Sequence, residues 1–356
     1  MKNLEKYVSV LEENLDGLLL TSRFSRMYGA EYDIAEGMAI VSKSGCRYFT
    51  DSRYIEDAQN NIAGFEVIQM DAAHPYGKLL NEAIEDFGIQ KLGYEEAYMT
   101  VSEYQGLKEK LNAQMIPCNA KIHSFRSVKE PWELDRIRKA QQITDQAFAE
   151  VLGKIRIGMT EKQLLAELIY CLLKNGADGL SFDPIVVSGP NTSKPHGVPG
   201  DRKIASGDFI TMDFGAMYRG YCADMTRTVA VGFATEEMKK VYETVLEAQN
   251  AAIAFSKAGV KGKQIDEVAR NIIAEAGYGS YFGHGYGHSI GMECHEAPNC
   301  NPREERQMEE NMVSSAEPGI YLPGKFGVRI EDLIIFTANG CENITQSPKN
   351  LIILEI

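Results

Sequence analysis

Short apolar runs alternate with longer amphipathic segments through the first third of the chain. Apolar residues gather at 18–20, 38–41, 48–50 and 65–68, in lengths and compositions typical of β-strands. Segments 76–87 and 101–111 instead repeat their apolar residues at helical spacing. This alternation predicts a small α/β domain that covers residues 1–124.

A polar stretch at 126–131 follows and predicts a linker. Pro131 suits the first turn of a helix, because proline lacks the backbone N–H that a first turn leaves unpaired. The apolar residues behind it recur on one helical face. They are Leu134, Ile137, Ile143, Phe148 and Val151. We therefore expect a long helix to open a second domain, residues 125–356.

The second domain repeats part of its own pattern. Segment 158–164 resembles segment 259–265, and in each a glycine precedes a Lys-Gln pair that opens a helix. Each of these helices then meets a glycine at the same offset, Gly176 and Gly277. A histidine-bearing loop and a carboxylate-bearing hairpin follow in both copies. The order predicts an α+β domain with a pseudo-two-fold repeat and a site between its halves.

Two predicted hairpins each carry a pair of acids. Segment 209–231 reads as two strands around a polar turn at 218–221, which makes Asp213 and Asp224 near cross-strand partners about 5 Å apart. In the second hairpin Glu317 and Glu331 are equidistant from Gly324, within a turn at 323–325. Two carboxylates so close repel each other unless a cation lies between them. We therefore expect the two hairpins to enclose divalent cations.

A glycine- and histidine-rich run at 282–291 separates the two hairpins. His288 and His295 supply imidazoles that can bind a metal or transfer a proton near neutral pH. His196 occupies the corresponding loop of the first copy, opposite His295 of the second. Four carboxylates and one imidazole suit a pair of hard or borderline divalent ions, which can make hydroxide available at neutral pH.

Charge and cysteine content narrow the class of protein. The 356 residues carry 37 basic and 50 acidic side chains, a net charge of −13, which is not the basic surface that nucleic acid or an anionic membrane attracts. No apolar run is long enough to span a bilayer. The 7 cysteines are odd in number and form no CxxC pair, so we expect reduced thiols in a cytoplasmic protein. Cys294 and Cys300 flank the histidine run and could add metal affinity.

At these residues the chain resembles the metal-dependent peptidases of the pita-bread fold, which include methionine aminopeptidase, prolidase and Xaa-Pro aminopeptidase. The resemblance covers the whole chain. In the second half it rests on segments 213–216, 226–228, 287–288, 295–296, 317–319 and 329–332. In the first half, segments 16–22 and 49–54 resemble the creatinase-type N-terminal domain of the proline-specific branch. The resemblance implies a creatinase-like α/β domain followed by a pita-bread catalytic domain.

The resemblance also implies a ligand set for two divalent metal ions. Asp213 would bind one metal, Asp224 and Glu331 would bridge both, and His288 and Glu317 would bind the other. Glu317 would in addition accept and pass on the proton of the attacking water. Mn²⁺ is the expected metal, and Co²⁺, Fe²⁺ or Zn²⁺ could take its place.

Further residues match substrate positions of that family. His196 and His295 would contact the substrate carbonyl and stabilise the tetrahedral intermediate, and His284 would lie in the substrate site. Tyr321 and Arg329 would line the proline pocket or support the metal ligands. Two departures accompany these matches: Ser289 replaces a usual glycine, and 292–294 is a variant of a commonly Leu-(Glu/Asp)-Val stretch.

These implications predict an Xaa-Pro aminopeptidase, acting on peptides with proline at the second position and forming a homodimer. The alternative is a prolidase, which cleaves the Xaa-Pro dipeptide itself. A creatinase on this fold needs no metal, and the complete ligand set argues against it. A non-catalytic binding protein is the remaining alternative, and such proteins typically lose ligands.

Overall fold

The computed structural model describes residues 2–11 and 14–356, and the chain forms two compact units, Met1–Arg126 and Ser127–Ile356. The sequence placed the boundary after residue 124, which falls inside helix α6 (Asn119–Ser127). Half of the polar stretch predicted as a linker, 126–131, is therefore helical, and only residues 128–130 separate α6 from the next helix. Among the described residues, no helix combines the length and apolar composition needed to cross a bilayer.

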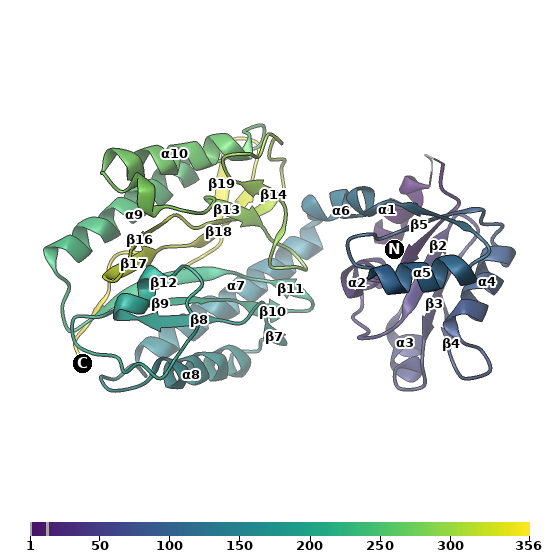
Figure 1. The fold of residues 1–356 in the computed structure, drawn as a ribbon, viewed down its shortest axis with the longest axis horizontal. Coiled ribbons are helices and arrows are strands. Elements are labelled where there is room, and N and C mark those ends of the chain that lie inside the picture. Colours follow the sequence, from purple (N-terminus) through teal and green to yellow (C-terminus); the bar gives the residue numbers. More distant parts are fainter. Residues whose placement is uncertain (1, 12–13) are drawn as a thin grey trace. The chain divides into compact units, whose positions relative to one another are not determined.

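The first unit is a mixed six-stranded sheet flanked by helices (Figure 1). Its strand order is β4-β3-β2-β1-β5-β6, with β2 antiparallel to both β1 and β3 and the remaining neighbours parallel. The strands are β1 (Gly17–Leu20), β2 (Met38–Ser42), β3 (Cys46–Thr50), β4 (Glu66–Gln69), β5 (Lys91–Tyr94) and β6 (Gln114–Pro117). The helices are α1 (Lys2–Val10), α2 (Arg23–Ala30), α3 (Ile55–Asn61), α4 (Tyr76–Asp86) and α5 (Val101–Lys110). The four predicted strands and two predicted helices are confirmed.

Helix α5 differs from the expected amphipathic helix in its packing. It begins at the capping box of Thr100 and Glu103, yet it has no fully buried side chain. Tyr104 and Leu107 are only partly buried against the core of this unit. The helix is therefore set by its cap and its local propensity more than by an apolar face.

The second unit opens with α7 (Pro131–Leu152), which starts with proline in its first turn, as predicted. All five apolar residues expected on its inner face are buried. Helix α7 packs against α8 (Glu161–Lys174), and α9 (Glu236–Phe255) packs against α10 (Gly262–Glu275). In Figure 1 the first pair lies beside the teal strands of its half and the second pair beside the green and yellow strands of its half.

The two helix pairs are followed by strands in the same order. The first half contains β7 (Gly179–Leu180), β8 (Ile185–Ser188), β9 (Phe209–Phe214), β10 (Ala216–Tyr218), β11 (Tyr221–Cys222) and β12 (Met225–Val231). The second contains β13 (Gly287–Ser289), β14 (Glu296–Cys300), β15 (Val313–Ala316), β16 (Gly319–Leu322), β17 (Phe326–Arg329) and β18 (Asp332–Phe336). The main sheets run β20-β12-β9-β8 and β14-β13-β15-β18-β19, where β19 is Cys341–Asn343 and β20 is Ile353–Leu354. The predicted internal repeat is confirmed by this order.

Glycines at matching places support the repeat. Gly158 and Gly259 precede α8 and α10 with φ of +86° and +85°, and Gly176 and Gly277 follow those helices with φ of +99° and +87°. Left-handed backbone of this kind favours glycine, because other residues place their Cβ too close to the backbone. The repeated glycines therefore mark the same two turns in both halves.

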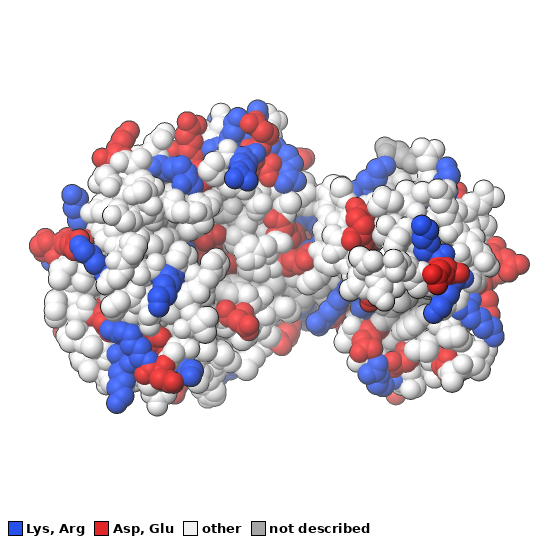
Figure 2. Space-filling model, in the orientation of Figure 1, with Lys and Arg blue, Asp and Glu red and all other residues white. Residues whose placement is uncertain are grey.

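The face of the protein shown in Figure 2 has basic and acidic side chains mixed together. On the face in Figure 2, lysine and arginine side chains are scattered among acidic ones over the second unit. Long-range electrostatic attraction of nucleic acid is therefore not favoured by this surface.

Candidate metal centre

The first acid hairpin is interrupted where its two acids lie. Strands β9 and β12 pair Asp213 with Thr226 and Phe214 with Met225, and β10 and β11 continue the same register to the turn. Asp224 thus follows the register of Gly215, two places from Asp213, so the two acids are near cross-strand partners, as predicted, without being directly opposite each other. They are diagonal neighbours on one face, a separation that side chains can still bridge.

Gly215 explains why the chain can fold so tightly at that interruption. A Cβ added at this position would lie 1.7 Å from the carbonyl oxygen of Ala223. Only glycine permits this approach of the two chains. The glycine of the Asp213-Phe214-Gly215 motif therefore brings the segment bearing Asp224 against β9.

The second acid hairpin follows the prediction closely. Its outer ladder pairs Ala316 with Asp332, and its inner ladder pairs Gly319 with Arg329. The register is the same in both, so Glu317 and Glu331 face each other across the gap between the ladders. Gly324 forms the tip with φ of +74°. The predicted pairing of these two acids about Gly324 is confirmed.

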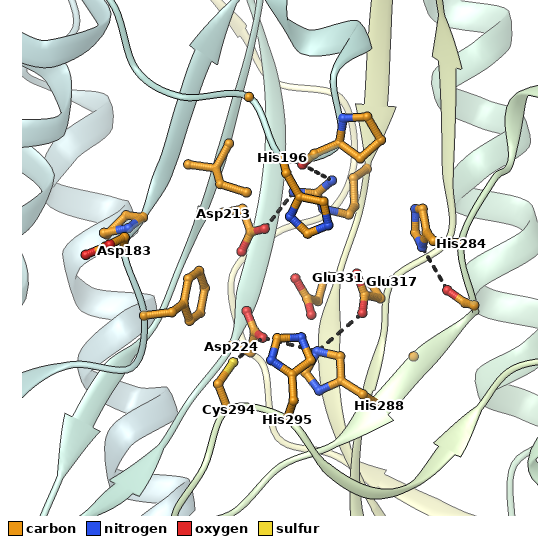
Figure 3. Close-up of a pocket in the computed structure, with 18 of the residues that line it drawn as sticks. Asp183, His196, Asp213, Asp224, His284, His288, Cys294, His295, Glu317 and Glu331 are labelled. Atoms are coloured by element: carbon orange, nitrogen blue, oxygen red, sulfur yellow. Dashed lines mark hydrogen bonds and ion pairs between the residues drawn. The ribbon is translucent and has the colours of Figure 1, made fainter. Parts of the chain in front are cut away.

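The four acids meet in a cavity of about 620 Å³ in the second unit. In Figure 3 the carboxylates lie between His196 on one side and His288, His295 and Cys294 on the other. Other lining residues come from the loops before and after β8, the histidine run, the end of β14 and the end of β17. They include Phe182, Asp183, Pro195, Val198, His284, Asn299, Asn301 and Arg329. The structure therefore brings the metal-type residues of both halves into one cavity.

Three carboxylate oxygens in this cavity have no hydrogen-bond partner among the described residues: Asp213 Oδ1, Asp224 Oδ1 and Glu331 Oε1. Asp224 is 4% exposed and Glu331 is 1% exposed. Burying unpaired carboxylate oxygens is costly, so the arrangement calls for a cation. Hard oxygen donors with one imidazole fit a divalent ion such as Mn²⁺.

His288 lies at the centre of this donor set. Its Nε2 is 3.5 Å from Asp224 Oδ2 and 3.4 Å from Glu317 Oε1. Ligand atoms of Asp224, His288 and Glu331 all lie within 4.8 Å of one another. Burial lowers the pKa of His288, which favours the neutral imidazole that binds metals. The carbonyl oxygen of Ser289 lies 3.2 Å from its Nδ1 and fixes the ring.

Burial and crowded negative charge raise the pKa of three of the acids. Burial and then neighbouring acids raise the pKa of Asp224 and Glu331 well above the ordinary carboxyl range. For Asp224 the neighbours are Asp213 and Glu317, and for Glu331 Asp224 leads. Burial is also the main cause that raises the pKa of Glu317 to about 7. Without a cation, protons would take the place of the missing positive charge.

Arg329 is the one lysine or arginine among the described residues that line the cavity. It forms an ion pair of 2.6 Å with Asp213 Oδ2 and donates at 2.8 Å to the Tyr321 hydroxyl. It also donates to the carbonyl oxygen of Pro195, at 3.1 Å, and so ties down the loop that carries His196. Neighbouring Tyr321, Asp213 and Glu317 outweigh burial and raise the pKa of Arg329 well above its ordinary value. Arg329 supports the ligands and one wall of the cavity at once.

Tyr321 and His284 form a pair behind that arginine. His284 Nε2 and the Tyr321 hydroxyl are 2.9 Å apart. Burial, followed by the charge of Arg329, lowers the pKa of His284 to about 4 and keeps it neutral near pH 7. His284 lines the cavity, whereas Tyr321 is not among the lining residues. The Tyr321 hydroxyl bonds to Arg329 and His284, which fits the expectation that Tyr321 supports the ligands, while a contact with substrate stays a prediction.

His196 and His295 face the acids from opposite sides (Figure 3). His196 lies in the loop after the short helix Gly189–Ser193 and is exposed to the cavity. The ring of His295 lies 4.1 Å from that of His288, centroid to centroid. Burial and the neighbouring His288 lower the pKa of His295. Both imidazoles reach the cavity without belonging to the acid hairpins.

Cys294, which the sequence suggested only as a possible addition to the metal ligands, lies next to the acids. Its thiol lines the cavity and donates to Asp224 Oδ2 at 3.3 Å. In the sequence, the position of Cys294 beside the histidine run was the one feature that pointed to a place at the site. Cys300, flagged with it, is buried next to the Ser314 hydroxyl and is not among the cavity-lining residues. Asp183, Asn299 and Asn301 also line the cavity, and no motif pointed to them.

Comparison with known proteins identifies both units. The second unit matches metallopeptidase family M24 over residues 135–338. The first matches the creatinase/prolidase N-terminal domain over residues 6–128. The predicted fold class is confirmed by these matches.

Individual relatives are similar over nearly their whole length. An Xaa-Pro dipeptidase of Pyrococcus furiosus is 39% identical, with 99% of each chain covered. The solved structure of an Xaa-Pro dipeptidase from Bacillus anthracis is 43% identical with a TM-score of 0.96, and 99% of each chain is covered. An X-Pro aminopeptidase from Thermotoga maritima MSB8 is 36% identical with a TM-score of 0.92, covering 98% of this chain and 99% of that one. The chain is therefore a metallopeptidase and belongs to metallopeptidase family M24, with a creatinase/prolidase N-terminal domain.

Proposed function

We propose that this protein is an Xaa-Pro dipeptidase, a prolidase that hydrolyses the bond before the proline of a dipeptide. The observation that carries the proposal is the cavity in which both hairpins turn their acids, with three unpartnered carboxylate oxygens, toward His288. Relatives named Xaa-Pro dipeptidase at 39% and 43% identity support the choice of substrate. They favour the dipeptidase over the aminopeptidase that the sequence led us to expect.

An Xaa-Pro aminopeptidase is the second candidate. The Thermotoga maritima structure of that name has the same fold over nearly the whole of this chain. The two activities share the scissile bond and differ in whether the substrate continues beyond the proline. Substrate length is therefore the property that separates them.

Asp213, Asp224, His288, Glu317 and Glu331 would hold the metal, and we propose two ions, with Mn²⁺ preferred. When bound, divalent ions lower the pKa of water and polarise a carbonyl group. Asp224 and Glu331 are the most buried of the four acids, at 4% and 1% exposure, and would hold metal deepest in the cavity. Asp213, held by Arg329, and Glu317, beside His288, would each serve one ion.

The side chains of the cavity would transfer the proton, stabilise the developing negative charge and position the other groups. Glu317, beside His288 in the cavity, would accept the proton of the attacking water and pass it to the leaving proline nitrogen. His295 and His196 reach the cavity from opposite sides and would hold the oxygen of the scissile carbonyl as its negative charge develops. Arg329 and Tyr321 keep Asp213 and neutral His284 in place around the substrate.

The proposal is tested by hydrolysis of Gly-Pro and of a tripeptide Gly-Pro-Ala, side by side, with Mn²⁺ and with a chelator. Cleavage of the dipeptide alone, lost on chelation, supports the dipeptidase. Cleavage of both peptides supports the aminopeptidase. Cleavage of neither, by protein shown to hold metal, rejects both and leaves a binding protein on this fold.

We also propose that the protein acts as a homodimer, as the family resemblance implies. Sedimentation velocity across a range of protein concentrations checks this. A single monomeric species at micromolar concentration would contradict it.

A further inference from the structure

Cys294 lies in the loop between β13 and β14 at the edge of the acid cluster. Its thiol donates to Asp224 Oδ2 at 3.3 Å and lines the cavity. It is only partly buried, so a small ion in the cavity can reach it. In Figure 3 the sulfur points toward Asp224, with His295 and His288 beside it.

Two imidazoles complete a donor cluster around this thiol. Ligand atoms of His288, Cys294 and His295 all lie within 4.8 Å of one another. The two rings lie 4.1 Å apart at an interplanar angle of 35°. One sulfur and two nitrogens at this spacing are the donors that zinc and other thiophilic cations prefer.

Asp224 points to a cation independently of the cysteine. It is 4% exposed, and its Oδ1 has no hydrogen-bond partner among the described residues. Its other oxygen accepts the Cys294 thiol. One oxygen of this buried carboxylate is thus unpaired, and the other accepts a hydrogen bond from a neutral thiol. Neither contact supplies the positive charge that would compensate the acid.

We propose that His288, Cys294 and His295, with Asp224 beside them, form a second binding mode of the cavity, for a thiophilic divalent cation such as Zn²⁺ or Cd²⁺. On binding, the S–H bond of Cys294 breaks, a sulfur–metal bond forms, and the proton passes to solvent. This donor set differs from the oxygen-rich one, which uses Asp213, Glu317 and Glu331 and has no sulfur. Mn²⁺, which prefers oxygen, has little affinity to gain from Cys294.

The two binding modes exclude each other. They share His288 and Asp224, and a cation on His295 removes the imidazole proposed to hold the substrate carbonyl. Thiophilic ions are therefore inhibitors that compete with Mn²⁺. This consequence rests on the proposed peptidase function, whereas binding through Cys294 does not.

Binding is tested by titrating the metal-free protein with Cd²⁺ while recording ultraviolet absorption, in which a thiolate–cadmium bond gives a charge-transfer band. The wild-type protein should develop the band, and Cys294→Ser should lack it and bind Cd²⁺ about tenfold or more weakly. Mn²⁺ affinity, measured by calorimetry, should be the same in both proteins. Cys341→Ser is the matched control, since Cys341 is also partly buried in the second unit but its thiol donates to the carbonyl oxygen of Ile253.

An unchanged band and Cd²⁺ affinity in Cys294→Ser would overturn the proposal, as would their loss in Cys341→Ser. Circular dichroism and Mn²⁺ binding verify that each variant is folded, and Cys294→Ala provides a second variant if the serine fails to fold. A separate assay measures Gly-Pro hydrolysis against Cd²⁺ at fixed Mn²⁺, where Cys294→Ser should need more Cd²⁺ for half-inhibition. An inactive wild-type protein that still shows the band would reject the proposed function and leave the cation site standing.

Discussion

The two acid hairpins have the same topology but hold their acids differently. In the second, Glu317 and Glu331 face each other in one continuous register. In the first, Asp213 is opposite Thr226, and Asp224 is displaced by two places along the partner strand. In both halves the hydrogen-bonded ladder of the hairpin is interrupted near the acids. The two halves differ in where the acids lie relative to that interruption.

The difference is compensated by contacts between the halves. Thr226 of the first hairpin donates to Glu331 Oε2 at 2.7 Å, and Arg329 of the second pairs with Asp213. The backbone N–H of Glu331 also donates to the Thr226 carbonyl oxygen, at 3.1 Å. Each hairpin therefore orients an acid of the other, and neither half alone has a complete site.

The largest expected effect comes from removing the most buried acid of each hairpin. Asp224→Asn and Glu331→Gln should each lower kcat for Gly-Pro by about 1,000-fold, equivalent to ~4 kcal/mol of activation free energy. Equal losses would show that the two halves contribute equally despite their different registers. Glu310→Gln, an exposed acid ahead of β15, is the control and should keep full activity. Wild-type turnover by either buried-acid variant, at saturating Mn²⁺, would refute the ligand assignment.

Breaking the charge pair between the hairpins should be the next largest effect. Arg329→Met leaves the partly buried Asp213 without its cation, which should lower the free energy of unfolding by about 3 kcal/mol in chelator. Urea denaturation measures this loss. Saturating Mn²⁺ should recover part of it, because the ion supplies positive charge next to Asp213.

The double variant Arg329→Met with Asp213→Asn is the matched control. If the loss arises from the unpaired acid, the double variant should be more stable than Arg329→Met alone. Additive losses would mean that Arg329 acts through its bonds to Tyr321 and Pro195 instead.

The crowded acids should make the metal-free protein less stable as pH rises. Glu317 titrates near 4.5 in the unfolded chain and about 7 in the folded one. The pKa values of Asp224 and Glu331 are raised further above the ordinary range. The folded state thus binds more protons, and each such carboxyl lowers the free energy of unfolding by up to about 1.4 kcal/mol per pH unit.

A histidine whose pKa is lowered in the folded state makes the protein more stable as pH rises toward 6.5, its ordinary pKa, and so opposes this trend. The stability change above pH 6.5 therefore reports on the acids. The melting temperature in chelator should fall between pH 6.5 and about 8, and Mn²⁺ should abolish most of the fall. A melting temperature in chelator that is flat or rising over this range would contradict the raised pKa values.

The smallest effect should come from the hydroxyl that joins the hairpins. Thr226→Val removes the hydrogen bonds to Glu331 and to Arg329 Nε, the latter 3.0 Å long, at a cost of about 1–3 kcal/mol in stability. Because Glu331 loses its orienting partner, Mn²⁺ affinity should fall as well. Thr228→Val is the matched control, since Thr228 donates to the Arg329 carbonyl oxygen and touches none of the acids. Its stability should fall while Mn²⁺ affinity stays unchanged; equal affinities in both variants would refute the orienting role of Thr226.

Local patterns were sufficient for much of the fold. The strands from β1 to β4, the start of α7 at Pro131 and the pairing of Glu317 with Glu331 all followed from periodicity, proline and the turn at Gly324. The exact register of the first hairpin did not follow, because its turn is centred on Arg219 and Gly220 and places Asp224 opposite Gly215. The sequence also did not show that α6 extends to Ser127, because polar residues such as those at 126–127 can end a helix as well as form a linker.

The sequence by itself determined the inventory of this site: which residues can bind metal, the repeat that carries them, and the turns that bring each pair of acids together. Those properties depend on side-chain chemistry and on contacts within one hairpin. Only the tertiary structure decided that Arg329 compensates Asp213, that the Tyr321 hydroxyl bonds to His284 and that Cys294 meets Asp224. Those contacts join residues that are distant in the chain, and the contacts of Arg329 with Asp213 and of Cys294 with Asp224 form only when the two halves bury their acids against each other.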